Sequence, residues 1–214
     1  MAETEVRIGL GGDGSLRGTL AIPQGASGLV LFAHGSASSR LSPRNKFVSG
    51  YLNRKGIGTM LFDLLTEEEG RIDDITGQLR FDIGLLSRRL SAATEWALSN
   101  NEAGKLGIGY FGSSTGAAAA LISAAGMHAH VKAVVSRGGR PDLAAGSLPK
   151  VRCPTLLIVG GLDEEVIELN REAMQKLRCE KKLEVVDGAT HLFEEAGKLE
   201  EVSRLASEWF TRYL

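Results

Sequence analysis

One pentapeptide of the chain has the residue types expected of a serine nucleophile. The sequence GSSTG at residues 112–116 follows the apolar run 106–111 and precedes an alanine-rich, helix-forming segment. G-x-S-x-G between a strand and a helix predicts a sharp turn, in which small neighbours make room for a strained serine backbone. Such a turn places the Ser114 hydroxyl at a helix N-terminus, where N–H groups stabilise negative charge. We predict that Ser114 is the nucleophile; the alternative is a helix cap by Ser113 or Ser114.

A neutral serine hydroxyl needs a base to take its proton, and the chain offers four histidines. His191 lies in a loop after the last apolar run and before the last helical pattern, from which its imidazole could swing toward Ser114. His34 also follows a strand, but a glycine comes next, so we predict that it shapes a loop. His128 and His130 precede a strand, which puts them at the opposite end of the sheet. The predicted base is His191.

The imidazole in turn needs a carboxylate that fixes its tautomer and stabilises its charged form. Asp163 follows the apolar run LLIVGGL, at the end of a predicted strand. Glu164 and Glu165 are adjacent competitors, and Asp63 ends an earlier strand. With Asp163, the chain order is serine, aspartate, histidine, which is the order of α/β-hydrolases. We therefore predict Asp163 as the acid.

Acyl transfer also needs hydrogen-bond donors for the developing oxyanion. The backbone N–H of Thr115, directly after the nucleophile, is the first predicted donor. The second is expected from the segment HGSA at residues 34–37, and we predict the backbone N–H of Ser36.

Two arginines follow the apolar run 131–135 and so lie near the same end of the sheet. Arg137 and Arg140 could receive a carboxylate of the substrate, because guanidinium groups bind carboxylates well. A salt bridge of this loop with Asp142 is an equally good interpretation.

The elements that must position these residues alternate along the chain from about residue 28. Short apolar runs are continuous, as expected for parallel strands covered on both faces, and helical patterns lie between them. Strands are predicted at 29–33, 60–62, 106–111, 131–135, 155–159 and 183–186, and helices along 81–97, 166–177 and 199–213. Residues 5–23 predict an antiparallel hairpin.

We therefore predict a single α/β-hydrolase domain over residues 1–214, with a mostly parallel central sheet, an N-terminal antiparallel hairpin and helices on both faces. The connection between 131–135 and 155–159 is too short for a large lid domain. Residues 64–80 are not assigned, and their run of charges predicts a solvated face.

Composition narrows the possible partners and compartment. A formal net charge of −1 gives no general attraction to nucleic acid or to an anionic membrane. The first residues do not resemble a signal peptide, no apolar run is long enough for a membrane span, and the two cysteines lie in no metal-binding pattern. We expect a cytoplasmic protein with reduced thiols, no nucleic-acid or membrane partner and no cofactor or metal.

Four segments, AHGSASSR, GYFGSSTGAAAAL, LLIVGGLDEEV and GATHLFEE, resemble in order and spacing the oxyanion, nucleophile, acid and histidine segments of α/β-hydrolases. The chain resembles the dienelactone hydrolase-like branch of that superfamily over nearly its whole length. Dienelactone hydrolase itself is known for a cysteine nucleophile, whereas Ser114 stands at this position here. The resemblance thus implies an α/β-hydrolase fold and favours a general esterase.

Together these residues predict a serine hydrolase that cleaves small-molecule esters or lactones through an acyl-enzyme intermediate. A thioesterase or acyltransferase would use the same three residues. A catalytically idle binding module on a hydrolase fold is the alternative from another class.

Overall fold

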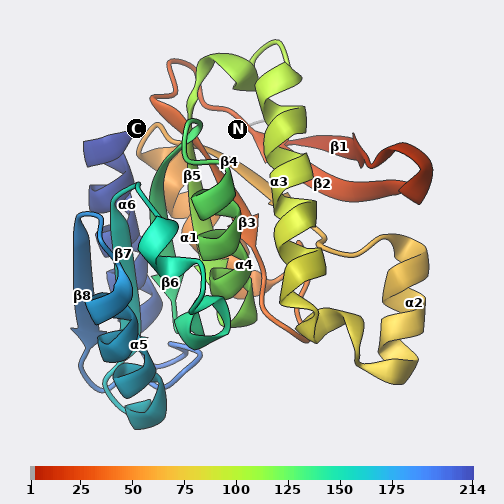
Figure 1. The fold of residues 1–214 in the computed structure, drawn as a ribbon. Coiled ribbons are helices and arrows are strands. Elements are labelled where there is room, and N and C mark those ends of the chain that lie inside the picture. The colour runs from red at the N-terminus through yellow and green to blue at the C-terminus, as the bar shows by residue number, and fades with distance from the viewer. Residues whose placement is uncertain (1–2) are drawn as a thin grey trace.

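A computed structural model describes residues 3–214 of the chain. Over these residues one eight-stranded sheet forms the centre of the molecule (Figure 1). Its strands are β1 (Thr4–Gly9), β2 (Ser15–Ala21), β3 (Gly28–Ala33), β4 (Gly58–Phe62), β5 (Gly107–Ser113), β6 (Val131–Arg137), β7 (Thr155–Gly160) and β8 (Lys181–Val186).

The strands lie in the order β1-β2-β4-β3-β5-β6-β7-β8. The hairpin β1–β2 is antiparallel and joins β4 in antiparallel register, while every pair from β4 to β8 is parallel. The carboxyl ends of β3, β5, β6 and β7 therefore meet at one edge of the sheet, where open α/β sheets bind ligands. All the predicted strands and the hairpin are confirmed.

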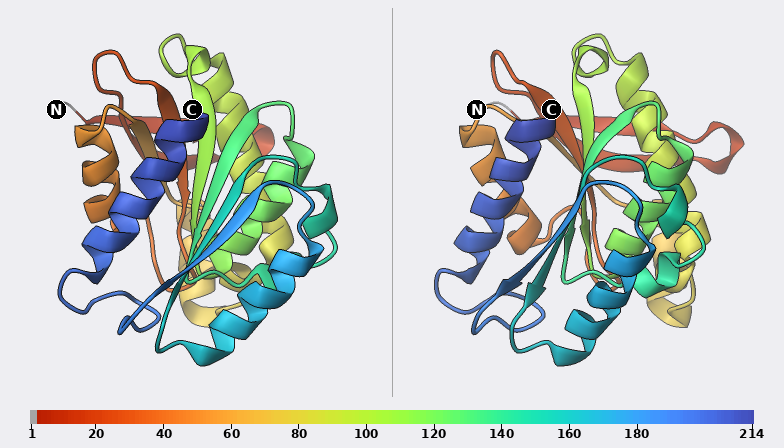
Figure 2. Two further views of the ribbon diagram at one scale, coloured as in Figure 1. Left: turned by 90° about the vertical axis from the view of Figure 1, so that its left-hand side faces the viewer. Right: turned by 60° about the vertical axis from the view of Figure 1, so that its left-hand side comes forward.

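Helices cover both faces of the sheet, as Figure 2 shows. They are α1 (Pro43–Arg54), α2 (Glu67–Thr76), α3 (Ile83–Ser99), α4 (Thr115–Gly126), α5 (Glu164–Lys176) and α6 (Lys198–Tyr213). Helices α1 and α6 lie on one face, and α3, α4 and α5 lie on the other. Because side chains alternate along a strand, Phe111 joins the core beneath α1 and α6 while Tyr110 joins the core beneath α3 and α4. The predicted α/β-hydrolase architecture is confirmed.

The segment 64–80, left unassigned from the sequence, contains helix α2. Its start is a capping box, in which the Thr66 hydroxyl accepts from Glu69 N and the Glu69 carboxylate accepts from Thr66 N. Asp73 ends the helix by accepting hydrogen bonds from Leu79 N and Arg80 N and by pairing with the Arg80 guanidinium. Burial alone would raise the pKa of Asp73, but these hydrogen bonds outweigh it and lower that pKa below its usual value.

Helix α1 was also not predicted, although the sequence signals its start. Ser42 caps it by accepting from Asn45 N, and Pro43 occupies its first position. None of the helices in the described part of the chain is long and apolar enough to cross a membrane.

Candidate active site

Ser114 occupies the sharp turn between strand β5 and helix α4. Its backbone has φ 51° and ψ −120°, a left-handed conformation that is costly for a residue other than glycine. A Cβ at Gly116 would lie 2.2 Å from Ala33 O, and one at Gly112 would lie 2.4 Å from Ala117 Cα. Both flanking positions of the motif must therefore be glycine, as the predicted strand-turn-helix requires.

Ser113, the other serine of the motif, faces away from the turn. Its hydroxyl donates to Asn45 Oδ1 of helix α1 over 3.2 Å, and the residue is only 2% exposed. A hydroxyl enclosed in this way cannot reach a substrate at the edge of the sheet, which separates Ser113 from Ser114.

Asp163 and His191 meet at the same edge, from the loops after β7 and β8. His191 Nδ1 lies 2.6 Å from Asp163 Oδ2, and the two side chains are 38% and 17% exposed. The two loops are joined by a hydrogen bond from Leu162 N to Ala189 O. A ring that donates its Nδ1–H to this carboxylate directs Nε2 away from Asp163.

The competing carboxylates are placed differently. Asp63 accepts a hydrogen bond from Arg40 N over 2.8 Å and also faces the Arg40 guanidinium. Glu164 and Glu165 are exposed in the first turn of helix α5. Among the described residues, only Asp163 has a carboxylate that pairs with His191.

Ser114 and His191 are held against consecutive residues of one segment. Ser114 N donates to Arg137 O over 3.2 Å, and a Cβ at Gly138 would lie 3.4 Å from His191 Cε1. No hydrogen bond joins the Ser114 hydroxyl to the His191 ring within residues 3–214. Catalytic hydrogen bonds are often long before substrate binds and shorten in the substrate complex.

His34 has both ring nitrogens occupied by backbone groups. Nδ1 donates to Gly35 O over 2.9 Å, and Nε2 accepts from Leu64 N over 3.1 Å. Although part of the residue still contacts solvent, burial of its ring lowers the pKa of His34 below the ordinary histidine value. These contacts fix a neutral ring that ties the segment after β3 to the segment after β4, in agreement with the predicted loop-shaping role.

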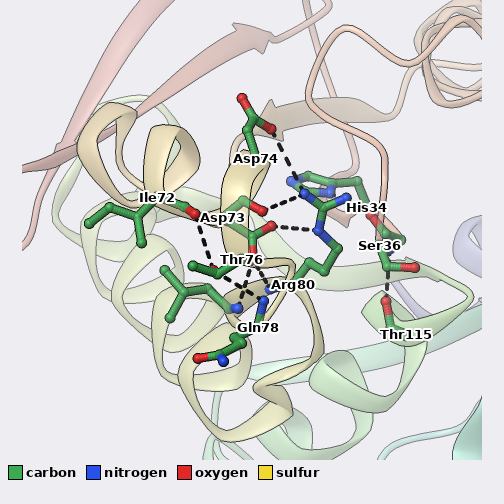
Figure 3. Close-up of polar contacts among 11 residues, drawn as sticks. His34, Ser36, Ile72, Asp73, Asp74, Thr76, Gln78, Arg80 and Thr115 are labelled. Atoms are coloured by element: carbon green, nitrogen blue, oxygen red, sulfur yellow. Dashed lines mark hydrogen bonds and ion pairs between the residues drawn. The ribbon is translucent and has the colours of Figure 1, made fainter.

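Ser36 and Thr115, the two predicted oxyanion donors, are in direct contact. Ser36 N donates to Thr115 Oγ1 over 2.9 Å, as Figure 3 shows. Thr115 is the first residue of helix α4, so its own N–H has no partner within the helix. The sequence did not reveal the role of the Thr115 side chain, because its partner lies 79 positions away in the chain.

The two arginines differ in their partners. Arg140 forms a bidentate pair with Asp142, with distances of 2.9 and 2.8 Å, so the loop salt bridge is present. Arg137 is 6% exposed, and its Nε and Nη1 are buried without a hydrogen-bond partner in the described structure. Burial, and after it the positive charge of Arg44, lower the pKa of Arg137 to about 10.

A cavity of about 760 Å³ adjoins the predicted oxyanion segment. It is lined mainly by residues 34–44 and by residues of the 63–74 segment. Its charged groups are mixed, with Arg40 beside Asp63 and Arg80 beside Asp74. Arg44 of helix α1, which also lines the cavity, pairs with Glu194 of the histidine loop, a connection across 150 positions that the sequence did not indicate.

The chain is similar to known proteins of one family. A model of the Dienelactone hydrolase family matches residues 53–213. The chain is similar to a crystal structure of dienelactone hydrolase from Anabaena variabilis, with a TM-score of 0.98, 54% identity, and coverage of 100% of this chain and 98% of that one. Est1E from Butyrivibrio proteoclasticus in complex with ferulic acid has a TM-score of 0.83 at 17% identity, over 97% and 98% of the two chains, and supports the fold alone.

Curated relatives from Mycobacterium tuberculosis are 49% identical over all 214 residues and are named "Putative phosphoribosyl transferase". The chain spans only 47% of their length, so that name describes proteins about twice as long. The match over residues 53–213 and the similarity across the whole chain agree on one conclusion. The chain belongs to the dienelactone hydrolase family, a family of hydrolases with the α/β-hydrolase fold.

Proposed function

We propose that the protein is a serine hydrolase of carboxylic esters or lactones, with Ser114 as nucleophile, His191 as base and Asp163 as acid. The 2.6 Å contact between His191 Nδ1 and Asp163 Oδ2 carries the proposal, because a carboxylate that accepts from Nδ1 selects the tautomer whose Nε2 can take the Ser114 proton. The strained backbone of Ser114 supports it, since such strain is typical of a nucleophile turn.

The reaction would proceed in two halves. His191 Nε2 takes the Ser114 proton as Oγ bonds to the carbonyl carbon, and the proton then passes to the leaving alcohol as the ester bond breaks. Water, deprotonated by His191, releases the acid and restores Ser114. The Thr115 N–H at the start of helix α4 is proposed as one oxyanion donor. The second donor expected from the sequence, the backbone N–H of Ser36, is directed at Thr115 Oγ1 in this structure.

The direct test uses a fluorophosphonate probe, which reacts covalently with an activated serine. Wild-type protein should be labelled and should hydrolyse p-nitrophenyl esters, and Ser114→Ala should lose both properties. Ser113→Ala is the matched control, because its hydroxyl bonds to Asn45 instead of facing the edge of the sheet. Labelling that survives Ser114→Ala but not Ser113→Ala would move the nucleophile by one residue.

Arg137 bears on the class of substrate. A guanidinium buried without an anionic partner is costly, and a carboxylate of the substrate would relieve that cost. We propose that Arg137 favours esters that carry a second, free acid group; Arg140, which already pairs with Asp142, is the weaker candidate.

This preference is measurable as a ratio of kcat/KM between an acid-bearing ester, such as a monoester of a dicarboxylic acid, and a neutral ester of equal length. Arg137→Met should lower the ratio about 10-fold or more, in the range expected for one charged hydrogen bond. Arg204→Met, whose guanidinium pairs with Glu208 on the surface, is the control. A ratio that is the same in wild type and Arg137→Met contradicts the role.

A thioesterase or acyltransferase would use the same three residues, and thioester substrates run beside the esters distinguish these activities. A binding module without activity predicts no labelling of Ser114 at all.

A further inference from the structure

One of the two predicted oxyanion donors, the backbone N–H of Ser36, already has a hydrogen-bond acceptor before substrate binds. An amide N–H has a single proton, and that of Ser36 is already directed at Thr115 Oγ1 over 2.9 Å (Figure 3). Thr115 is 5% exposed, and its contact with Ser36 is partly buried. Thr115 Oγ1 therefore occupies the position in which an oxyanion would have to lie in order to accept from Ser36 N.

The Thr115 hydroxyl, in contrast, retains a proton to give. Its oxygen accepts from Ser36 N, and within residues 3–214 no acceptor is hydrogen-bonded to its O–H. Buried polar groups are rarely left without a partner, so an unused buried O–H points to an acceptor supplied by a ligand. A hydroxyl that accepts one hydrogen bond also becomes a stronger donor of the next.

The place of Thr115 in the fold fits such an acceptor. It follows Ser114 directly and is the first residue of helix α4, whose N-terminus carries partial positive charge and free N–H groups. The backbone N–H and the side-chain O–H thus belong to one residue next to the nucleophile. The β-branched side chain restricts rotation about χ1, which limits the directions that the hydroxyl can take.

We infer that the side-chain hydroxyl of Thr115 is the second oxyanion donor and that the Ser36 N–H orients it. As Ser114 attacks, the carbonyl oxygen gains negative charge and accepts hydrogen bonds from Thr115 N–H and Thr115 O–H. The hydroxyl keeps its proton throughout, and Ser36 acts on the reaction only through Thr115. This role rests on the proposed serine hydrolase function.

The experiment compares Thr115→Val, which keeps the shape and removes the hydroxyl, with Thr115→Ser, which keeps the hydroxyl. On a p-nitrophenyl ester we expect Thr115→Val to lower kcat about 10²- to 10³-fold, as for loss of one oxyanion donor, with little change in KM. Thr115→Ser should stay within about 10-fold of wild type. An alkyl boronic acid, which forms a tetrahedral adduct with an active serine, should bind Thr115→Val more weakly by a factor similar to the loss in kcat/KM.

Two results would overturn the inference. Thr115→Val as fast as wild type, or faster, would mean that the freed Ser36 N–H is the donor and that the hydroxyl only occupies its place. Equal losses in Thr115→Val and Thr115→Ser would assign the side chain to packing. Thermal unfolding checks the folding of each variant, and Thr115→Ala replaces Thr115→Val if the latter does not fold.

Measurements on the wild-type protein distinguish failure of this oxyanion role from failure of the proposed hydrolase function. If it neither labels with fluorophosphonate nor hydrolyses any ester, the hydrolase proposal fails and the oxyanion role fails with it. If it labels and turns over while Thr115→Val is unimpaired, only the oxyanion role fails.

Discussion

His34 and His191 both follow strands at the carboxyl edge of one sheet, yet their surroundings differ in every respect that decides the chemistry of an imidazole. His34 gives both ring nitrogens to backbone groups, of Gly35 and Leu64. His191 gives one nitrogen to a carboxylate and is 38% exposed. Residue type and position at the sheet edge are therefore not enough to identify a base. A free ring nitrogen and an anionic partner are also needed.

The environment of His34 explains why it stays neutral. Burial lowers its pKa, and in the neutral ring Nδ1 can donate while Nε2 accepts from Leu64 N. A protonated ring would turn Nε2 into a donor facing another donor. His34 therefore acts as a fixed connection between two loops, whereas the His191 ring pairs with a carboxylate and is partly exposed.

The largest expected effect comes from removing the base. His191→Ala should lower kcat by about 10⁵- to 10⁶-fold on a neutral ester at every pH, as removal of a base that acts together with its serine does elsewhere. His34→Ala should keep a measurable rate, and that rate should still rise with pH because its base is intact. Pre-steady-state and steady-state rates between pH 5 and 9 check both. A flat pH profile in His34→Ala, with a normal one in His191→Ala, would reverse the two roles.

The carboxylate gives the next largest effect. Asp163→Asn should lower kcat by about 10⁴-fold, because the amide no longer holds the tautomer that leaves Nε2 unprotonated. Glu164→Gln is the matched control, since Glu164 is exposed in the first turn of helix α5. Steady-state kinetics of the pair decide the assignment, and equal small losses in both would direct attention to Asp63.

The features that could be predicted from the sequence depend on residues that are close together in the chain. Continuous apolar runs predicted the strands, and G-x-S-x-G with small neighbours predicted the turn at Ser114, because both depend on residues close in the chain. Chain order singled out Asp163, which the structure brings to His191. The helix at residues 67–76 was not predicted, although Thr66 and Glu69 have the spacing of a capping box.

Contacts between distant segments could not be predicted. The partner of Ser36 is Thr115, and the partner of the His34 ring is Leu64 N, both of which depend on how the loops at the end of the sheet meet. Whether Arg137 would find a carboxylate was open for the same reason. Only the assembled loops show that Arg137 is buried without a partner in the described structure, whereas the pair of Arg140 with Asp142 joins near neighbours and was one of the two interpretations of the sequence.

The weakest effect that we expect is on stability, and it tests whether His34 stays neutral in the folded protein. Below about pH 6.5 an unfolded chain protonates this histidine, whereas burial lowers its pKa in the folded protein. The unfolded state then binds more protons than the folded state, so this residue makes the free energy of unfolding decrease as pH falls.

His34→Gln cannot take up that proton. It should be less stable than wild type by about 1–3 kcal/mol at pH 7.5, through lost hydrogen bonds, and the difference should shrink toward pH 5.5. Urea unfolding at both pH values measures this, with His128→Gln as an exposed control. A difference that stays constant with pH would mean that His34 takes up its proton at the same pH in the folded and unfolded states, and its assignment as a fixed neutral connection would be wrong.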